Sequence, residues 1–213
     1  MSAGNFQASL SLTLVYEGGF CDNPKDPGGA TYLGVTQKVY DEFRDAWCRP
    51  RQSVSHIGDA ELNMLYATRY WQRVNADQLA LGLDYAVFDF AVNSGVGRAA
   101  RTLQGIVGVT ADGEIGPKTL QALSVHAGTY GVTALTDALC NARMTFLRSL
   151  PTFATFGNGW TRRVMGAQAG HQPGDTGVID RAYDMAAGNR IAMPTSVVIT
   201  AKTYNAKSLG VAA

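Results

Sequence analysis

Two carboxylates and a hydroxyl near the N-terminus have the types and spacing that acid–base chemistry needs. Eight residues separate Glu17 from Asp26, and four separate Asp26 from Thr31. Hydrolysis of a glycosidic bond uses one carboxyl group that stays protonated to donate to the leaving oxygen, and usually a second, ionised carboxylate. Different surroundings must therefore hold the two groups in opposite protonation states. We expect Glu17 to be the acid, and Asp26, with Thr31, to position a water molecule.

The segment before Glu17 predicts a helix that would bury part of this carboxyl. Phe6, Leu10 and Leu14 recur at steps of four, and Glu17 continues the same face, so we expect a first helix over residues 6–17. Partial burial favours the protonated form of a carboxyl, as a general acid requires.

Asp26 lies in a different setting, the turn-rich run Lys-Asp-Pro-Gly-Gly at residues 25–29. Hydration in such a loop keeps a carboxylate ionised. From spacing alone an alternative stays open, in which Glu17 is a solvated helix end and Asp26 is an ordinary turn residue.

The same stretch resembles the N-terminal signature of a known family. Residues 17–20 read EGGF and residues 23–36 read NPKDPGGATYLGVT, which is similar to glycoside hydrolase family 108, the N-acetylmuramidases of phage endolysins and typhoid-toxin secretion. The resemblance covers residues 6–165. It implies a bacteriolytic, lysozyme-type hydrolase that cleaves the β-1,4 bond between N-acetylmuramic acid and N-acetylglucosamine in peptidoglycan. The Glu of the EGG motif is the family's catalytic acid, which falls on Glu17.

The order Glu, Asp, Thr is also similar to the catalytic triplet of phage-type lysozymes, in which the gap between Asp and Thr is one residue longer. This similarity implies catalytic roles for Asp26 and Thr31. The family often has Asn where this chain has Tyr32, so we expect Tyr32 to alter a substrate contact.

The resemblance implies an α+β, mainly α-helical, lysozyme-like fold with a helical lobe and a small loop or hairpin lobe. We expect a catalytic region at 1–88, a helical lobe that resembles a peptidoglycan-binding segment at 89–165, and a C-terminal extension of unknown role at 166–213. Residues 31–35 are the best candidate for an extended piece, and 196–201 for a second one. Hydrophobic periodicity predicts helices over residues 60–75, 83–95, 97–107, 131–150 and 178–187.

Further candidates for substrate binding lie beyond the first motif. Tyr70 and Trp71 are aromatic residues that could stack on a sugar ring or pack in the core. Asn93 resembles a family element and is either a substrate contact or a helix cap. Asp89 lies inside an apolar helix, where a carboxylate is costly unless it is hydrogen-bonded. It is a structural anchor or a cleft residue.

Composition excludes several classes of protein. The 213 residues carry a net charge of +1, with 46% hydrophobic and 16% charged residues, as in a globular protein with a sizeable core. A nucleic-acid-binding protein would show a clear basic excess, so we expect no nucleic-acid partner. No apolar run approaches the roughly 20 residues of a membrane span, so we expect no stable membrane insertion.

The cysteines and the N-terminus bear on compartment and cofactors. Cys21, Cys48 and Cys140 are odd in number and widely spaced, so we expect neither a disulfide framework nor a metal site, and no cofactor. The N-terminus lacks a basic region followed by an apolar core, so we expect no signal peptide. A phage-type enzyme of this kind would be made in the bacterial cytoplasm. It would reach the periplasm or wall through a membrane lesion of the kind that a holin makes.

Two rival functions and one surface feature stay open. A lytic transglycosylase would use one Glu without a base, and a non-catalytic protein would only bind peptidoglycan. Four arginines lie between positions 143 and 163: Arg143, Arg148, Arg162 and Arg163. They form either a mild basic patch that could hold an anionic wall polymer, or an ordinary solvated face.

Overall fold

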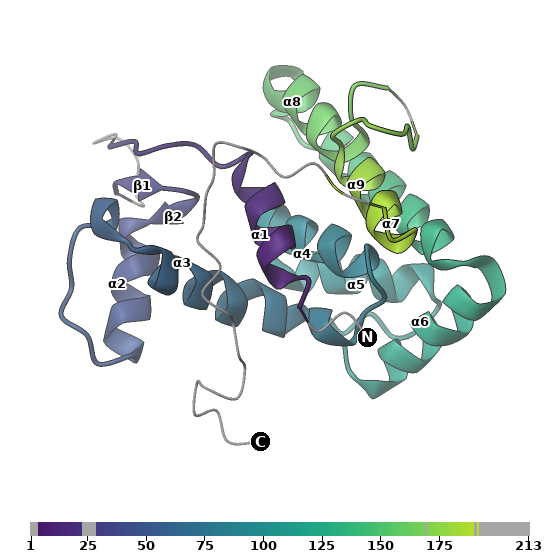
Figure 1. Cartoon of the computed structure of the whole chain (residues 1–213), viewed down its shortest axis with the longest axis horizontal. Coiled ribbons are helices and arrows are strands. Elements are labelled where there is room, and N and C mark those ends of the chain that lie inside the picture. The colour runs from purple at the N-terminus through teal and green to yellow at the C-terminus, as the bar shows by residue number, and fades with distance from the viewer. Residues whose placement is uncertain (1–3, 23–28, 169, 190, 192–213) are drawn as a thin grey trace. The chain divides into compact units, whose positions relative to one another are not determined.

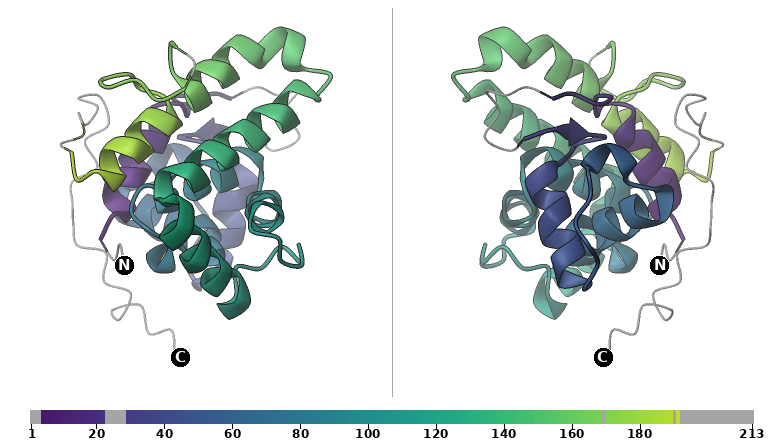
Figure 2. Two further views of the ribbon diagram at one scale, coloured as in Figure 1. Left: turned by 90° about the vertical axis from the view of Figure 1, so that its right-hand side faces the viewer. Right: turned by 90° about the vertical axis from the view of Figure 1, so that its left-hand side faces the viewer.

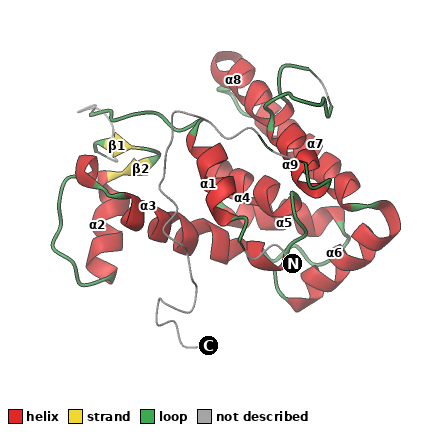
Figure 3. Ribbon diagram, viewed as in Figure 1, coloured by secondary structure: helices red, strands yellow, loops and turns green. Residues whose placement is uncertain are grey.

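The computed structural model shows an α+β, mainly helical, lysozyme-like fold, as the sequence predicts. It describes residues 4–22, 29–168, 170–189 and 191. Asp26 and the extended piece expected at 196–201 lie outside these ranges. Helices dominate the described chain, and the strands within it form a two-stranded hairpin (Figure 3). Among the described helices, none combines the length and apolar character that a membrane crossing requires.

The chain packs into two compact units. In its described part, the helical unit holds residues 4–9 and 68–191, and the hairpin unit holds residues 10–67. The chain passes from one unit to the other within helix α1, Phe6–Leu14. These units are defined by compact packing. The regions expected from the sequence, 1–88, 89–165 and 166–213, are defined by function and stay a prediction.

Helix α1 is shorter than the sequence predicts. It ends at Leu14 rather than at residue 17, although single backbone bonds continue as turns through Tyr16 and Glu17. Phe6, Leu10 and Leu14 are buried, as their spacing predicts. Glu17 therefore lies in the turn that follows the helix.

The hairpin unit is built around a tight antiparallel hairpin (Figure 1). Strands β1 (Thr31–Tyr32) and β2 (Val35–Thr36) are joined by Leu33 and Gly34. Both turn residues have positive φ, +49° and +74°, which is the type I′ geometry that suits the twist of a two-residue hairpin. The chain then enters α2 (Gln37–Ala46), whose N-cap is Thr36.

A charged clasp joins α2 to α3 (Asp59–Tyr66) within the hairpin unit. Glu61 accepts hydrogen bonds from Arg44 and Tyr40 of α2. Arg49, in the loop after α2, pairs with the same carboxylate at 2.6 Å. The loop from residue 48 to 58 contains a short 3₁₀ helix, η1 (Val54–His56). The clasp fixes where α3 begins and therefore where Tyr66 lies.

The helix expected over residues 60–75 is interrupted. After α3 the chain forms a π-helix, η2 (Ala67–Trp71), and then the 3₁₀ turns η3 (Gln72–Val74) and η4 (Ala76–Gln78). A π turn holds an extra residue, which moves the buried face along by one position. Trp71 is consequently buried and Tyr70 is half-buried, whereas steps of four from Tyr66 pointed to Tyr70.

Helix α4 (Leu83–Ser94) is the buried centre of the helical unit, as its apolar sequence predicts. It packs against α5 (Val96–Ile106), α7 (Val132–Arg148) and α9 (Val178–Ala186). Helices α6 (Pro117–Tyr130) and α8 (Phe153–Met165) pack on α7 (Figures 1 and 2).

A buried ion cluster ties three of these helices together. Asp89 of α4 accepts from Arg143 of α7 at 2.7 Å and from Arg163 of α8 at 2.8 Å. Asp89 is thus held as a structural anchor. Arg143 and Arg163 are buried, so they belong neither to a basic patch nor to a solvated face, and only Arg148 and Arg162 of the four predicted arginines are exposed.

Candidate active site

Glu17 lies where the chain leaves α1 and meets the hairpin turn. Its backbone N–H donates to the Leu14 carbonyl at 3.1 Å. The next carbonyl, that of Gly18, accepts from the N–H of Leu33 at 3.2 Å. The turn of the hairpin is therefore bonded directly to the residue that follows Glu17, and the Glu17 side chain is half-buried there.

The chain after Glu17 runs beside strand β1. Cys21 and Thr31 exchange two backbone hydrogen bonds, of 2.8 and 2.7 Å. The Thr31 hydroxyl lies 3.5 Å from the Gly29 carbonyl, a long contact that leaves the hydroxyl able to bind elsewhere. The structure thus places Glu17 and Thr31 on neighbouring segments of one unit, together with the half-buried Tyr32. Cys21 is an exposed free thiol.

Gly34 marks the point where the Glu17 carboxyl meets the hairpin. A Cβ added at Gly34 would lie 2.8 Å from Oε2 of Glu17 and 2.7 Å from the hydroxyl oxygen of Tyr66. Tyr66 comes from the end of α3, is 1% exposed, and donates its hydroxyl proton to the Leu33 carbonyl at 2.8 Å. The carboxyl of Glu17 therefore lies against the hairpin turn, in a space that only a residue without a side chain leaves open.

Sequence reasoning identified Glu17 but missed the residues that surround it. The Leu33-Gly34 pair carried a signal, because Gly at the second position of a two-residue loop is typical of a type I′ turn. Tyr66 carried none beyond its place in a helical repeat, since its contact with Leu33 spans 33 residues of sequence.

Two of the predicted substrate-binding residues lie side by side at the π-helix. Trp71 is fully buried and contacts the rings of Phe6 and Phe88, each at 5.4 Å between centroids. Its indole N–H donates to Asp77 at 2.8 Å. Trp71 therefore packs in the core, which is one of the two alternatives that the sequence left open. Tyr70 is the partly exposed member of the pair.

Asn93 lies in the last turn of α4 and is half-buried. Its side-chain oxygen accepts from the Ser94 hydroxyl at 2.9 Å. Gly95 follows with a φ of +93° and ends the helix. The Asn93 amide nitrogen is the group that a substrate could still contact.

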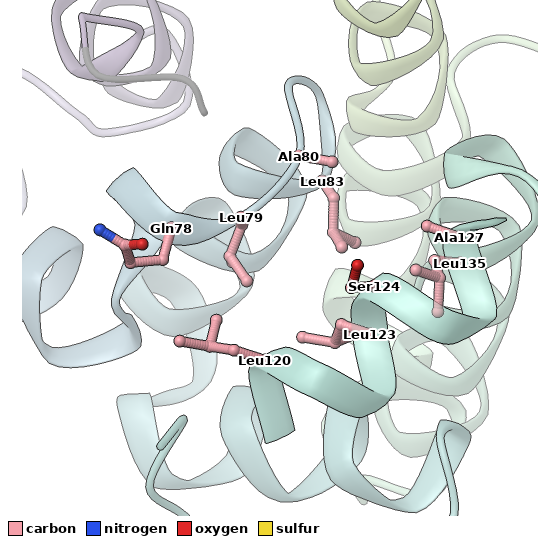
Figure 4. A pocket seen from close by; sticks show the side chains of 9 residues that line it. All are labelled: Gln78, Leu79, Ala80, Leu83, Leu120, Leu123, Ser124, Ala127 and Leu135. Atoms are coloured by element: carbon pink, nitrogen blue, oxygen red, sulfur yellow. The ribbon is translucent and has the colours of Figure 1, made fainter. Parts of the chain in front are cut away.

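A pocket of about 240 Å³ lies in the helical unit between η4, α4, α6 and α7 (Figure 4). Five of its nine lining side chains are leucines; the full lining is Gln78, Leu79, Ala80, Leu83, Leu120, Leu123, Ser124, Ala127 and Leu135. These described residues include no titratable group, so this pocket does not supply acid–base chemistry.

Two family models match consecutive parts of the chain. The model described as glycosyl hydrolase 108 matches residues 10–95, which include Glu17, the hairpin and Asn93. The model described as a predicted peptidoglycan domain matches residues 98–165, from α5 to α8.

A solved structure of SagA from Brucella abortus is similar to the chain throughout its own length. The two sequences are 35% identical, the TM-score is 0.68, and the match covers 86% of this chain and 97% of that one. No curated protein matches the sequence.

Proposed function

We propose that this chain, which belongs to the glycosyl hydrolase 108 family, is an N-acetylmuramidase that uses Glu17 as its general acid. The family and the adjoining peptidoglycan domain make it a glycoside hydrolase of peptidoglycan. The proposal adds the bond, β-1,4 between N-acetylmuramic acid and N-acetylglucosamine, and the roles of individual residues.

The observation that carries the proposal is the position of the Glu17 carboxyl. It is half-buried against Gly34 and the Tyr66 hydroxyl, and the bond from Leu33 to Gly18 fixes the backbone beside it. A general acid must hold a proton near neutral pH and present it to the leaving oxygen in one position. The rigid turn beside the carboxyl serves the second need, a single position.

In the proposed reaction, Glu17 transfers its proton to the glycosidic oxygen as the bond from that oxygen to C1 of N-acetylmuramic acid breaks. Asp26 accepts a proton from a water molecule whose oxygen forms the new bond to C1, and the Thr31 hydroxyl helps to orient that water. Tyr32, beside Thr31 in β1, would contact the sugar. Tyr70 and Asn93 stay proposed substrate contacts.

Mass spectrometry of fragments released from purified sacculi tests the bond and the acid together. We expect the wild type to release fragments with reducing N-acetylmuramic acid ends. Glu17→Gln keeps the size and polarity of the side chain but cannot donate an acidic proton, so we expect a loss of at least about 100-fold in rate. A Glu17→Gln protein that releases the same fragments at the wild-type rate would remove Glu17 from the mechanism.

The same experiment separates the rival functions. Anhydro ends, together with little loss of rate in Asp26→Asn, would indicate a lytic transglycosylase. Sacculi that bind the wild type and Glu17→Gln equally, with no fragments from either, would indicate a peptidoglycan-binding protein without catalysis.

A further inference from the structure

We propose that Tyr66 is a positioning residue that holds the Glu17 carboxyl through its hydroxyl oxygen, in a space kept open by Gly34. The inference rests on the proposed function, because it assumes the acid role of Glu17. It adds a residue from α3, 49 positions further along the sequence, to the site at the end of α1.

The Tyr66 hydroxyl donates in one direction, towards the hairpin backbone. A tyrosine hydroxyl has one proton to donate and lone pairs to accept with. Tyr66 donates its proton to the Leu33 carbonyl at 2.8 Å. Towards any other neighbour it can therefore only accept.

The Glu17 carboxyl and the Tyr66 hydroxyl face the same small space beside Gly34. Its Oε2 and the Tyr66 hydroxyl oxygen lie 2.8 and 2.7 Å from one point, the position of a Cβ on Gly34. A protonated carboxyl can donate to the Tyr66 oxygen, whereas an ionised carboxylate, which is an acceptor only, cannot. The Tyr66 oxygen can thus serve as an acceptor that orients the Glu17 carboxyl when it donates.

A side chain at position 34 would crowd both the Tyr66 hydroxyl and the Glu17 carboxyl. The Tyr66 ring is 1% exposed and its hydroxyl is tied to the hairpin backbone. The Glu17 carboxyl is the far end of a longer, half-buried side chain. A methyl group at position 34 would therefore displace the Glu17 carboxyl further than the Tyr66 hydroxyl, although it crowds both, and would lower activity as well as stability.

The first test is Tyr66→Phe, which keeps the buried ring and removes the hydroxyl. We expect kcat on soluble peptidoglycan strands to fall about 10- to 100-fold, because a misplaced catalytic group costs about that much. KM should stay within about twofold, since a buried hydroxyl does not touch the sugar. A folded Tyr66→Phe protein with kcat within twofold of the wild type would overturn the proposal.

Tyr183→Phe is the matched control for this variant. Tyr183 is a half-buried tyrosine of α9 in the helical unit, and its hydroxyl donates to Asp137 at 2.6 Å. Its loss should lower the melting temperature and leave kcat unchanged, because neither residue belongs to the proposed site. An equal loss of kcat in both variants would mean that the loss of any bonded tyrosine hydroxyl lowers activity, and the positioning role would fall.

The second test is Gly34→Ala against Gly188→Ala. Both glycines have left-handed φ, +74° and +70°, but a Cβ at Gly188 meets nothing within 4 Å. Backbone strain is thus matched and only the crowding differs. We expect Gly34→Ala to lose more thermal stability than Gly188→Ala, and only Gly34→Ala to lose kcat, by about 10-fold or more. Equal kcat in the two variants would contradict the role of Gly34.

Crystal structures of Tyr66→Phe and Gly34→Ala decide the inference even if the wild type releases no fragments. In that case the proposed function fails, while the position of the Glu17 carboxyl can still be compared with the wild type. We expect the carboxyl to be displaced in both variants. A Glu17 carboxyl that keeps its place in both would end the proposal, whatever the activity.

Discussion

Leu33 adopts a backbone conformation that its side chain disfavours. Its φ of +49° lies in the left-handed region, which costs an L-residue with a Cβ roughly 1 kcal/mol. This strained residue has three contacts or neighbours that matter to the site. The Leu33 N–H donates to the Gly18 carbonyl, and the Leu33 carbonyl accepts from Tyr66. The next residue, Gly34, leaves space for the Glu17 carboxyl. Strain of this kind is characteristic of backbone that serves a site.

Replacing Leu33 by Asn should relieve part of this strain, because Asn tolerates the left-handed region and is favoured in type I′ turns. Leu33→Ala is the reference, since both variants lose the apolar side chain. We expect the Asn variant to be more stable than the Ala variant by about 0.5–1 kcal/mol in urea unfolding. Equal stabilities would mean that the turn relaxes to a different geometry in the Ala variant.

The sequence located the proposed acid, Glu17, but not the residues around it, for a physical reason. Glu17 and Thr31 belong to a short motif, so a local pattern identifies them. Tyr66 reaches the same place only because α3 folds back against the hairpin, and a contact across 33 residues leaves no local trace. The conformation of Leu33 was also unpredictable, because Leu itself disfavours it and the tertiary contacts of the turn decide.

The clasp between α2 and α3 positions Tyr66, so its energy bears on the site. Burial alone would raise the pKa of Glu61, but the hydrogen bond from Tyr40 and the contacts with Arg49 and Arg44 lower it overall. The Glu61 and Arg44 side chains are only 13% and 11% exposed, so they are screened less than a surface pair.

Glu61→Gln tests the clasp, because it keeps the shape and removes the charge. We expect a loss of about 1–3 kcal/mol of stability at pH 7, since the nearly buried Arg44 loses its counter-ion. Asp45→Asn is the matched control. It breaks the pair with Arg51, in which both side chains are well exposed, and should cost clearly less than Glu61→Gln. Equal losses in urea unfolding would show that the clasp behaves as a surface feature.

The ion cluster of Asp89 joins helices α4, α7 and α8, as the clasp joins α2 and α3. Two guanidinium groups share one buried carboxylate, and the Arg143 guanidinium also lies 5.2 Å from the centre of the Phe90 ring. The cluster therefore depends on Asp89 more than on either arginine.

Asp89→Asn should cost about 3–5 kcal/mol, because it leaves two buried cations without their counter-ion. The triple variant Asp89→Leu, Arg143→Leu, Arg163→Met should lose less than Asp89→Asn, since it removes the buried charges together. Urea unfolding of both proteins checks the order. If the triple variant is less stable than Asp89→Asn, then the ion cluster stabilises the fold more than apolar side chains in its place would.

At this scale the periodic helices were predictable and the interruption was not. The apolar sequence of α4 predicts a buried central helix, and the structure has one. The π-helix after α3 shifted the buried position from Tyr70 to Trp71, and no local feature of Ala-Thr-Arg-Tyr-Trp announces an extra residue in a turn. For the same reason the exposure of Arg143 could not be predicted without knowing that Asp89 faces it.

At the scale of the whole molecule, most of the described titratable groups with shifted pKa values act in one direction at each end of the pH scale. Among the residues that the structure describes, five carboxyl groups have lowered pKa values: Asp45, Glu61, Asp89, Asp112 and Asp175. Asp180 opposes them, because burial raises its pKa. At the alkaline end, burial raises the pKa of Cys140 to about 12, and burial together with the bond to Asp137 raises the pKa of Tyr183 to about 12.

These shifts predict stability that is highest between about pH 4 and pH 9 and falls on both sides. Burial would raise the pKa of Asp89, but Arg163 and Arg143 outweigh it and lower the value from 3.8 to about 2. Its contribution of about 2 kcal/mol is complete above its unfolded pKa and is lost as the pH falls towards 2. Cys140 and Tyr183 are neutral when folded, so their contributions are complete below their unfolded values and are lost as the pH rises towards 12.

Urea unfolding from pH 2 to 11 measures this profile, and two variants assign its limbs. Asp89→Asn cannot ionise at this position, so below pH 4 its stability should fall less steeply than that of the wild type, although it is lower throughout. Cys140→Ala should remove the earliest part of the alkaline decline, because an unfolded thiol begins to ionise near pH 9 while tyrosines follow about one unit later. If the acid limb keeps its slope in Asp89→Asn, then the exposed carboxylates, rather than the buried cluster, govern acid unfolding. In that case the three-helix anchor is not the element that acid releases first.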